Sequence, residues 1–154
     1  MKLYFLRHGQ ADWPAWARPD DERPLNDRGQ KQMRRVARSL AALKVKPDVI
    51  LSSPLPRAYQ TAEIAAGPLK LTVTMEGALA PGFDAEQLAA LLRRYAGLNL
   101  MLVGHEPDFS RVIGALTGGA VRMAKAGLAR VDINAPGALR GELVWLAPPK
   151  LLDR

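Results

Sequence analysis

Short apolar runs alternate with helical periodicities along most of the chain. The runs predict four strands, at residues Lys2 to Leu6, Asp48 to Ser52, Leu71 to Thr74 and Asn99 to Val103. Three of them are nearly all apolar, which is typical of strands buried on both faces of a parallel sheet. The alternation of strands with helices therefore predicts an α/β domain with a mostly parallel central sheet.

Four helices are predicted between and after these strands. The first runs from Asp27 to about Leu43. The second has Ser53 as its cap and Pro54 in its first turn, and it stops at Gly67-Pro68. The third begins with a capping box formed by Asp84 and Gln87, and the fourth begins near Pro107 and ends at Gly118-Gly119. Each helix thus begins or ends at residues that favour a helix terminus.

The pattern changes in the last quarter of the sequence. Leu128 to Ile133 and Leu139 to Leu146, separated by the turn residues 134–137, predict an antiparallel strand pair. Residues Ala147 to Arg154 contain two prolines, and we expect them to form a tail along the surface. We find no internal repeat, so a single domain over residues 1–154 is expected.

One long segment lacks any period. Residues Gln10 to Pro24 contain Trp13, Trp16 and three prolines, which predicts an irregular loop. Loops of this length are often functional lids. The alternative is that the two tryptophans only pack the loop against the domain.

The composition excludes some kinds of site and favours anionic ligands. The absence of cysteine excludes disulfides, thiolate metal sites and a cysteine nucleophile. The apolar run at the N-terminus is shorter than that of a signal peptide, and no stretch reaches the ~20 apolar residues of a membrane span. We therefore expect a cytoplasmic protein without a membrane partner. The formal net charge of +7 favours anionic ligands, including phosphorylated proteins, phosphometabolites and nucleic acids.

Part of the positive charge lies on the first predicted helix. Arg28, Lys31, Arg35 and Arg38 recur at helical spacing opposite an apolar face of Met33, Val36, Ala37 and Leu40. This pattern is typical of the solvated face of an amphipathic helix. No aromatic residues alternate with these cations, as binding of single-stranded nucleic acid would favour, so we expect no nucleic-acid partner.

Polar residues suited to catalysis directly follow the predicted strands. They are Arg7, His8 and Gly9 after the first strand, Ser52, Ser53 and Arg57 around the end of the second, and Gly104, His105 and Glu106 after the fourth. Parallel sheets bind ligands at the carboxyl ends of their strands, where helix N-termini also attract anions. The chain has only two histidines, and both are next to a glycine at a strand end, which favours a shared role.

This set of residues suits phosphate better than a metal ion. Zinc takes three or four His, Cys or carboxylate ligands, and neighbouring guanidinium groups would repel a dication. Arginine binds phosphate oxygens in bidentate fashion, and a neutral imidazole can attack phosphorus. We therefore expect a phosphate pocket with no metal and no cofactor.

Four motifs resemble those of the histidine phosphatase superfamily, also called the phosphoglycerate-mutase-like family. They are Leu-Arg-His-Gly at 6–9, Arg-Pro-Leu followed by Arg-Gly at 23–29, Ser-Ser-Pro-Leu-Pro-Arg-Ala-Tyr-Gln-Thr-Ala at 52–62 and Val-Gly-His-Glu-Pro at 103–107. Their order, the short length and the Arg-Pro-Leu element are most similar to the SixA-type phosphohistidine phosphatases. The resemblance covers most of the chain and implies a three-layer α/β/α sandwich.

The resemblance also implies roles for single residues. His8 would be the nucleophile of a phosphatase that forms a covalent phosphohistidine, with Arg7, Arg57 and His105 completing the pocket. Arg23, and Gly9 of the first motif, would contact phosphate or substrate.

The sequence departs from the larger members of the family at residues 78–82. Those members have a carboxylate general acid there, whereas this chain reads Ala-Leu-Ala-Pro-Gly. An alkoxide leaving group needs a positioned acid, while an imidazole leaving group needs it less. The departure favours phosphohistidine on a protein as substrate and disfavours a mutase. Glu76, Glu106 and Asp12 remain as alternative acids.

Two other functions stay open. A small-molecule phosphomonoesterase would act on a sugar or nucleotide phosphate, so the partner would be either a phosphorylated protein domain or a small phosphorylated substrate. A non-catalytic binder of phosphorylated or nucleic-acid ligands would use the basic helix around Arg34 and would show binding that weakens steeply with salt.

Overall fold

The computed structural model describes residues 1–152, which are built around one six-stranded sheet with the strand order β3-β2-β4-β1-β5-β6. The strands are β1 (Lys2–Arg7), β2 (Val49–Ser52), β3 (Val73–Met75), β4 (Leu100–Gly104), β5 (Leu128–Ala135) and β6 (Arg140–Ala147). The first four are parallel, while β5 runs antiparallel to β1 and β6 antiparallel to β5. This topology confirms the predicted mostly parallel sheet and the C-terminal antiparallel pair.

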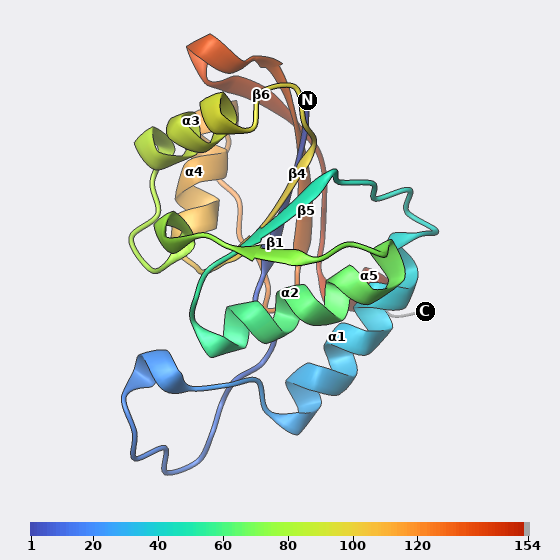
Figure 1. The fold of residues 1–154 in the computed structure, drawn as a ribbon, viewed down its shortest axis with the longest axis vertical. Helices are drawn as coiled ribbons and strands as arrows, with labels where there is room; N and C mark the ends of the chain where they lie inside the picture. The colour runs from blue at the N-terminus through green and yellow to red at the C-terminus, as the bar shows by residue number, and fades with distance from the viewer. Residues whose placement is uncertain (153–154) are drawn as a thin grey trace.

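Helices cover both faces of the sheet (Figure 1). On one face lie α1 (Asp27–Leu40), α2 (Pro56–Leu69) and α5 (Pro149–Leu152), and on the other lie α3 (Ala85–Arg94) and α4 (Asp108–Thr117). The three-layer α/β/α sandwich is therefore confirmed.

Each face of the sheet has its own apolar core. Successive side chains of a strand point to opposite faces, so Phe5 packs in the cluster with Phe109 of α4, whereas Tyr4 packs in the cluster with Val36 of α1. This two-sided burial explains why β1 and β4 are apolar along almost their whole length.

The boundaries of α1 and α2 differ from those expected. Helix α1 ends at Leu40, and α2 begins at Pro56 and continues through Gly67 and Pro68 to Leu69. Ser53 does not cap α2, because the helix begins three residues later, at Pro56, and the Ser53 backbone N–H still donates to Val103 O of the sheet at 2.9 Å. Leu55 is the extended N-cap residue, and Pro56 takes the first helical position, where its missing N–H is not needed.

The C-terminal segment also differs from the expected surface tail. Residues Pro149–Leu152 form a helical turn, and Leu152 is buried in the core cluster on the α1 face. The hydroxyl of Ser39 in α1 donates to Leu152 O. Burial of the leucine side chain and this hydrogen bond dock the segment on α1. Residues 153–154 lie outside the described part of the chain.

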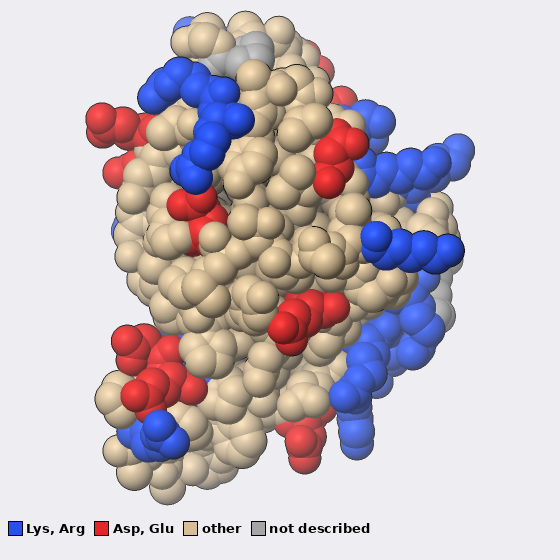
Figure 2. All heavy atoms as spheres, in the orientation of Figure 1, with Lys and Arg blue, Asp and Glu red and all other residues tan. Residues whose placement is uncertain are grey.

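The basic face of α1 is exposed, as predicted. Arg28, Lys31, Arg34, Arg35 and Arg38 are all exposed, whereas Met33, Val36, Ala37 and Leu40 are buried. Figure 2 shows Lys and Arg side chains gathered at the lower right of the view, where α1 lies. Within residues 1–152, no helix has the length and apolar character needed to cross a membrane.

The segment between β1 and α1 forms the predicted irregular loop, with one short 3₁₀ helix at Asp20–Glu22. Residues at the start of α1 contact the first residues of this loop. Asn26 caps α1 by accepting from Gly29 N at 2.8 Å, and its side-chain amide donates to Asp12 O at 2.9 Å. Gly29 is required here, because a Cβ at this position would lie 2.1 Å from Gln10 O.

Candidate active site

The pairing of β1 with β4 brings the two histidines together. Arg7 is in register with Gly104, and His8 N donates to Gly104 O at 3.0 Å. The imidazole rings of His8 and His105 consequently lie 5.3 Å apart between centroids, with an interplanar angle of 57°.

A backbone contact fixes the orientation of the His8 ring. Its Nδ1 lies 2.7 Å from Gly9 O, and since a carbonyl only accepts, Nδ1 is the protonated nitrogen. The lone pair is then on Nε2. His8 therefore has the tautomer that an Nε2 nucleophile requires.

Both imidazoles are held neutral. Burial lowers the pKa of His8 to about 4, with the charges of Arg57 and Arg7 adding to the effect against a raising contribution from the Gly9 hydrogen bond. Burial also lowers the pKa of His105 to about 3, followed by repulsion from His8 and the two arginines. His105 Nε2 lies 2.8 Å from Ser53 Oγ, which also accepts from Leu55 N at 3.2 Å.

Arg7 and Arg57 both have an unused donor at this site. Arg7 Nη1 donates to Met123 O at 2.9 Å, and Arg57 Nη1 donates to Asp20 O at 2.9 Å. Among residues 1–152, the buried side-chain nitrogen or oxygen atoms without a hydrogen-bond partner are Arg7 Nε and Arg57 Nε. Buried donors normally have partners, so these two nitrogens are exceptions, and both guanidinium groups line the same pocket.

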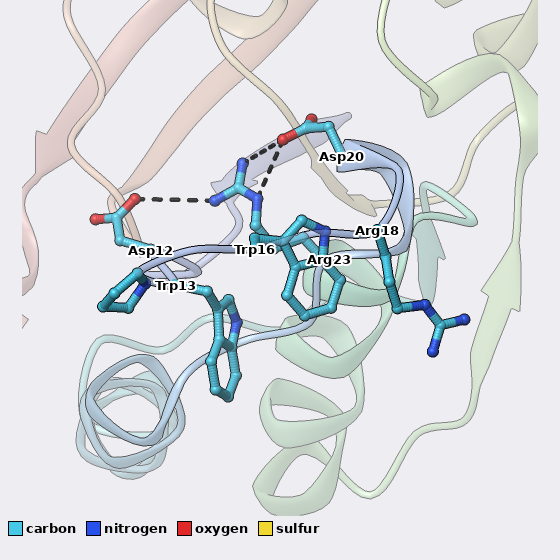
Figure 3. Close-up of a pocket in the computed structure, with 7 residues that line it drawn as sticks. Asp12, Trp13, Trp16, Arg18, Asp20 and Arg23 are labelled. Carbon is cyan, nitrogen blue, oxygen red and sulfur yellow. Dashed lines mark hydrogen bonds and ion pairs between the residues drawn. The ribbon is translucent and has the colours of Figure 1, made fainter.

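A carboxylate from the loop bridges two of the arginines. Asp20 Oδ1 accepts from Arg23 Nε and Nη2 at 3.1 and 2.9 Å, and its Oδ2 lies 3.3 Å from Arg57 Nη2. Arg23 Nη1 also donates to Ala11 O and lies 3.9 Å from Asp12 (Figure 3). These contacts hold Arg23 beside Arg57, although the two come from different segments of the chain.

The site is a pocket of about 340 Å³. Its lining consists of Arg7, His8, Ala11, Asp12, Asp20, Arg23, Arg57, Pro81, His105, Glu106 and Lys125. The structure thus brings together five of the six expected site residues. Gly9 does not line the pocket: its N–H donates to Thr61 Oγ1 at 3.0 Å and its carbonyl accepts from His8, so it orients the His8 ring instead.

Carboxylates in and near the pocket are engaged by other groups. Asp12 binds Lys125 Nζ at 2.9 Å, and hydrogen bonds from Lys125 and Gln10 lower its pKa. The pKa of Asp20 is lowered by its hydrogen bonds from Arg23. Glu106 accepts from Ser110 N at 2.9 Å.

Glu76, the third acid considered from the sequence, is not among the pocket residues. Its carboxylate accepts from Ala78 N at 3.2 Å and from Arg94 Nη1 at 3.0 Å. Pro81, from the segment where an acid was expected and is missing, lines the pocket instead.

Sequence reasoning missed Asp20, Lys125, Thr61 and the role of Ser53. A cluster of acidic residues between Pro19 and Arg23 was a signal for an arginine partner, but it did not identify which carboxylate bridges. Lys125 gave no signal, because its partner Asp12 is 113 residues away. Within the described residues, no group of three or more His, Cys, Asp or Glu is arranged to hold a metal ion.

Comparison with known proteins gives consistent matches. The family model for the histidine phosphatase superfamily (branch 1) matches residues 3–81. An uncharacterized protein of Picosynechococcus sp. is 37% identical, over 99% of this chain and 99% of its own length.

Solved structures are similar over nearly the whole chain. The protein histidine phosphatase SixA complexed with tungstate has a TM-score of 0.87 and 26% identity and covers 99% of each chain. A mycobacterial glucosyl-3-phosphoglycerate phosphatase has a TM-score of 0.76 and 21% identity, with 96% of this chain and 99% of its own covered, which is a similarity of fold.

Proposed function

Since this chain belongs to the histidine phosphatase superfamily, we propose that it is a phosphatase that removes the phosphoryl group from phosphohistidine in a protein. The observation that supports this most directly is the pairing of a neutral His8, with its Nε2 lone pair free, with the guanidinium groups of Arg7 and Arg57 in one pocket.

The first chemical step uses the free lone pair of His8. Nε2 attacks phosphorus, a new P–N bond forms to His8, and the P–N bond of the substrate breaks. The guanidinium groups of Arg7, Arg57 and Arg23 stabilise the charge on the equatorial phosphoryl oxygens. The substrate imidazole leaves with a proton from solvent.

The second step regenerates the enzyme. Water attacks the phosphorus of phospho-His8, the P–Nε2 bond breaks, and inorganic phosphate leaves. Nδ1 remains bonded to Gly9 O throughout, which keeps the ring orientation constant between the two steps.

The state of the pocket carboxylates supports phosphohistidine as the substrate. Asp12 and Asp20 are held ionised by lysine and arginine partners, so neither is a ready proton donor. An alkyl phosphate would leave as an alkoxide that needs such a donor, whereas a phosphohistidine ring can accept its proton before the bond breaks. The similarity to SixA at 26% identity agrees with this choice.

A substrate panel tests the proposal. The purified chain is assayed for phosphate release from a phosphohistidine-containing protein, a phosphoserine peptide, sugar phosphates, a nucleotide and an aryl phosphate, with His8→Ala as the blank. We expect the highest kcat/KM for the phosphohistidine protein. A higher value for a sugar or nucleotide phosphate would instead support a small-molecule phosphomonoesterase, and salt-sensitive nucleic-acid binding without turnover would support a non-catalytic binder.

A further inference from the structure

The long loop contains a second pocket that borders the pocket around His8, which is called the phosphate pocket below. This tryptophan pocket, of about 600 Å³, is lined by Asp12, Trp13, Pro14, Trp16, Arg18, Asp20 and Arg23 (Figure 3). It shares Asp12, Asp20 and Arg23 with the phosphate pocket. A group attached to a phosphoryl bound beside Arg23 can therefore extend across this shared wall.

The two indoles offer a ligand their ring surfaces but no free N–H donor. Trp13 Nε1 donates to Pro24 O at 2.8 Å, and Trp16 Nε1 donates to Pro19 O at 3.1 Å. Because backbone carbonyls occupy both N–H groups, the indoles cannot donate to hydroxyls or base edges of a ligand. Trp13 nevertheless remains 39% exposed, which leaves a large aromatic surface open beside a catalytic pocket.

Taking the proposed function as its premise, we propose that the tryptophan pocket binds the polypeptide chain next to the phosphorylated residue of a protein substrate. Residues 10–24 then select phosphoproteins over small phosphates.

The geometry of the rings favours a polypeptide over a flat nucleobase. The ring centroids of Trp13 and Trp16 lie 6.0 Å apart and the planes are tilted by 41°, so the rings do not form parallel jaws. Aliphatic and aromatic side chains of a peptide tolerate such tilted surfaces. Exposed tryptophans that become covered by a partner are also among the largest contributors to protein binding.

The charged rim fits the same occupant. Arg18 lines only the tryptophan pocket and is paired with Glu22 at 2.7 Å, while Asp12 and Asp20 also line the phosphate pocket. All three have exposed side chains and can contact polar groups of a peptide without losing their own partners. The pocket thus combines an apolar floor with a polar edge, as protein interfaces do.

The test compares each phosphorylated amino acid in two forms, free and within a protein, for both phosphohistidine and phosphoserine. In Trp13→Ala, we expect the ratio of kcat/KM for the protein-borne form over the free form to fall by roughly 10- to 100-fold. Trp13→Phe retains a ring and should preserve most of the ratio. Leu98→Ala is the control, because Leu98 is 38% exposed but precedes the amino end of β4, whereas the pockets lie beyond the carboxyl ends of the strands.

The outcomes separate this inference from the proposed function. Wild-type preference for protein-borne phosphoserine would overturn phosphohistidine as the substrate, while the Trp13→Ala ratio would still test the pocket. Equal losses on the free and protein-borne forms, or no loss on either, would overturn the polypeptide pocket. Activity on small phosphates alone would overturn both.

Discussion

The phosphate pocket and the tryptophan pocket are neighbours that are built in opposite ways. In the phosphate pocket, backbone carbonyls hold Arg7, His8 and Arg57, and these side chains come from elements packed in the core. In the tryptophan pocket, every lining residue comes from one loop, and the two indoles are held by backbone carbonyls of that same loop, at Pro24 and Pro19. The first pocket therefore suits chemistry that needs fixed geometry, and the second suits recognition, which tolerates variation.

Asp20 links the two pockets. Its side chain is 71% exposed, yet it contacts Arg23 and the nearly buried Arg57. The loop thus helps to orient two arginines of the phosphate pocket. Substitutions in each region should separate effects on chemistry from effects on selection.

The largest effect is expected for His8→Ala. Turnover of every substrate should fall by roughly four orders of magnitude or more, because no other described side chain offers the same free Nε2 beside the arginines. Rapid quenching of the wild type should trap an acid-labile, base-stable phosphoenzyme that is absent from the variant. Substantial activity in a folded His8→Ala protein would exclude the covalent mechanism.

Arg57→Ala should follow, with a loss of roughly 100- to 1000-fold in kcat. Its guanidinium lines the phosphate pocket and has a buried, unpartnered Nε, so its loss removes charge stabilisation in the transition state. Arg57→Lys retains the charge without the bidentate geometry and should recover activity only in part. Arg38→Ala, on the exposed face of α1, is the matched control and should change kcat less than twofold. Equal losses in Arg57→Ala and Arg38→Ala would mean that the site is elsewhere.

The pKa values of the two histidines should be lower than usual by two units or more. Burial disfavours the charged imidazolium, so each ring should lose its proton at about 4 for His8 and about 3 for His105 instead of near 6.5. His8 then stays neutral and nucleophilic down to about pH 5. Since the chain has two histidines, NMR titration of their ring protons gives two curves that measure both values directly. A midpoint above 6 for either would contradict the buried, neutral pair.

The two regions also differ in how far the sequence predicts them. The apolar runs predicted strand ends at Leu6 and Val103, one residue before the observed ends, and the parallel-sheet rule then placed His8 beside His105. The loop gave no such rule, because its contacts join residues far apart in the chain: Asp20 with Arg57 across 37 positions and Asp12 with Lys125 across 113.

Local patterns were also insufficient where a residue had a competing partner. Ser53 followed by Pro54 satisfies the pattern of a helix cap, yet the Ser53 hydroxyl lies against His105, 52 residues away. The surface helix α1 had no such competitor, and its amphipathic pattern predicted the exposed face correctly. Sequence patterns thus predict the helices and strands, and they fail where a side chain has a competing partner that is distant in the chain.

The smallest expected effect concerns the missing acid. Glu106 lines the phosphate pocket and accepts from Ser110 N, whereas Glu76 lies outside it and is paired with Arg94, so the two form a matched pair of variants. If departure of the leaving group needs no enzyme acid, Glu106→Gln and Glu76→Gln should each change turnover of alkyl and aryl phosphates by less than about threefold. The wild type should also hydrolyse the aryl ester far faster than the alkyl ester, because the aryl group leaves without a proton. The measurement is kcat/KM of both variants on both esters. A loss of about a hundredfold confined to Glu106→Gln and the alkyl ester would identify Glu106 as the proton donor, since only a poor leaving group depends on a proton donor. That result would remove the chemical argument for phosphohistidine and favour a phosphomonoesterase, while leaving the nucleophilic role of His8 intact.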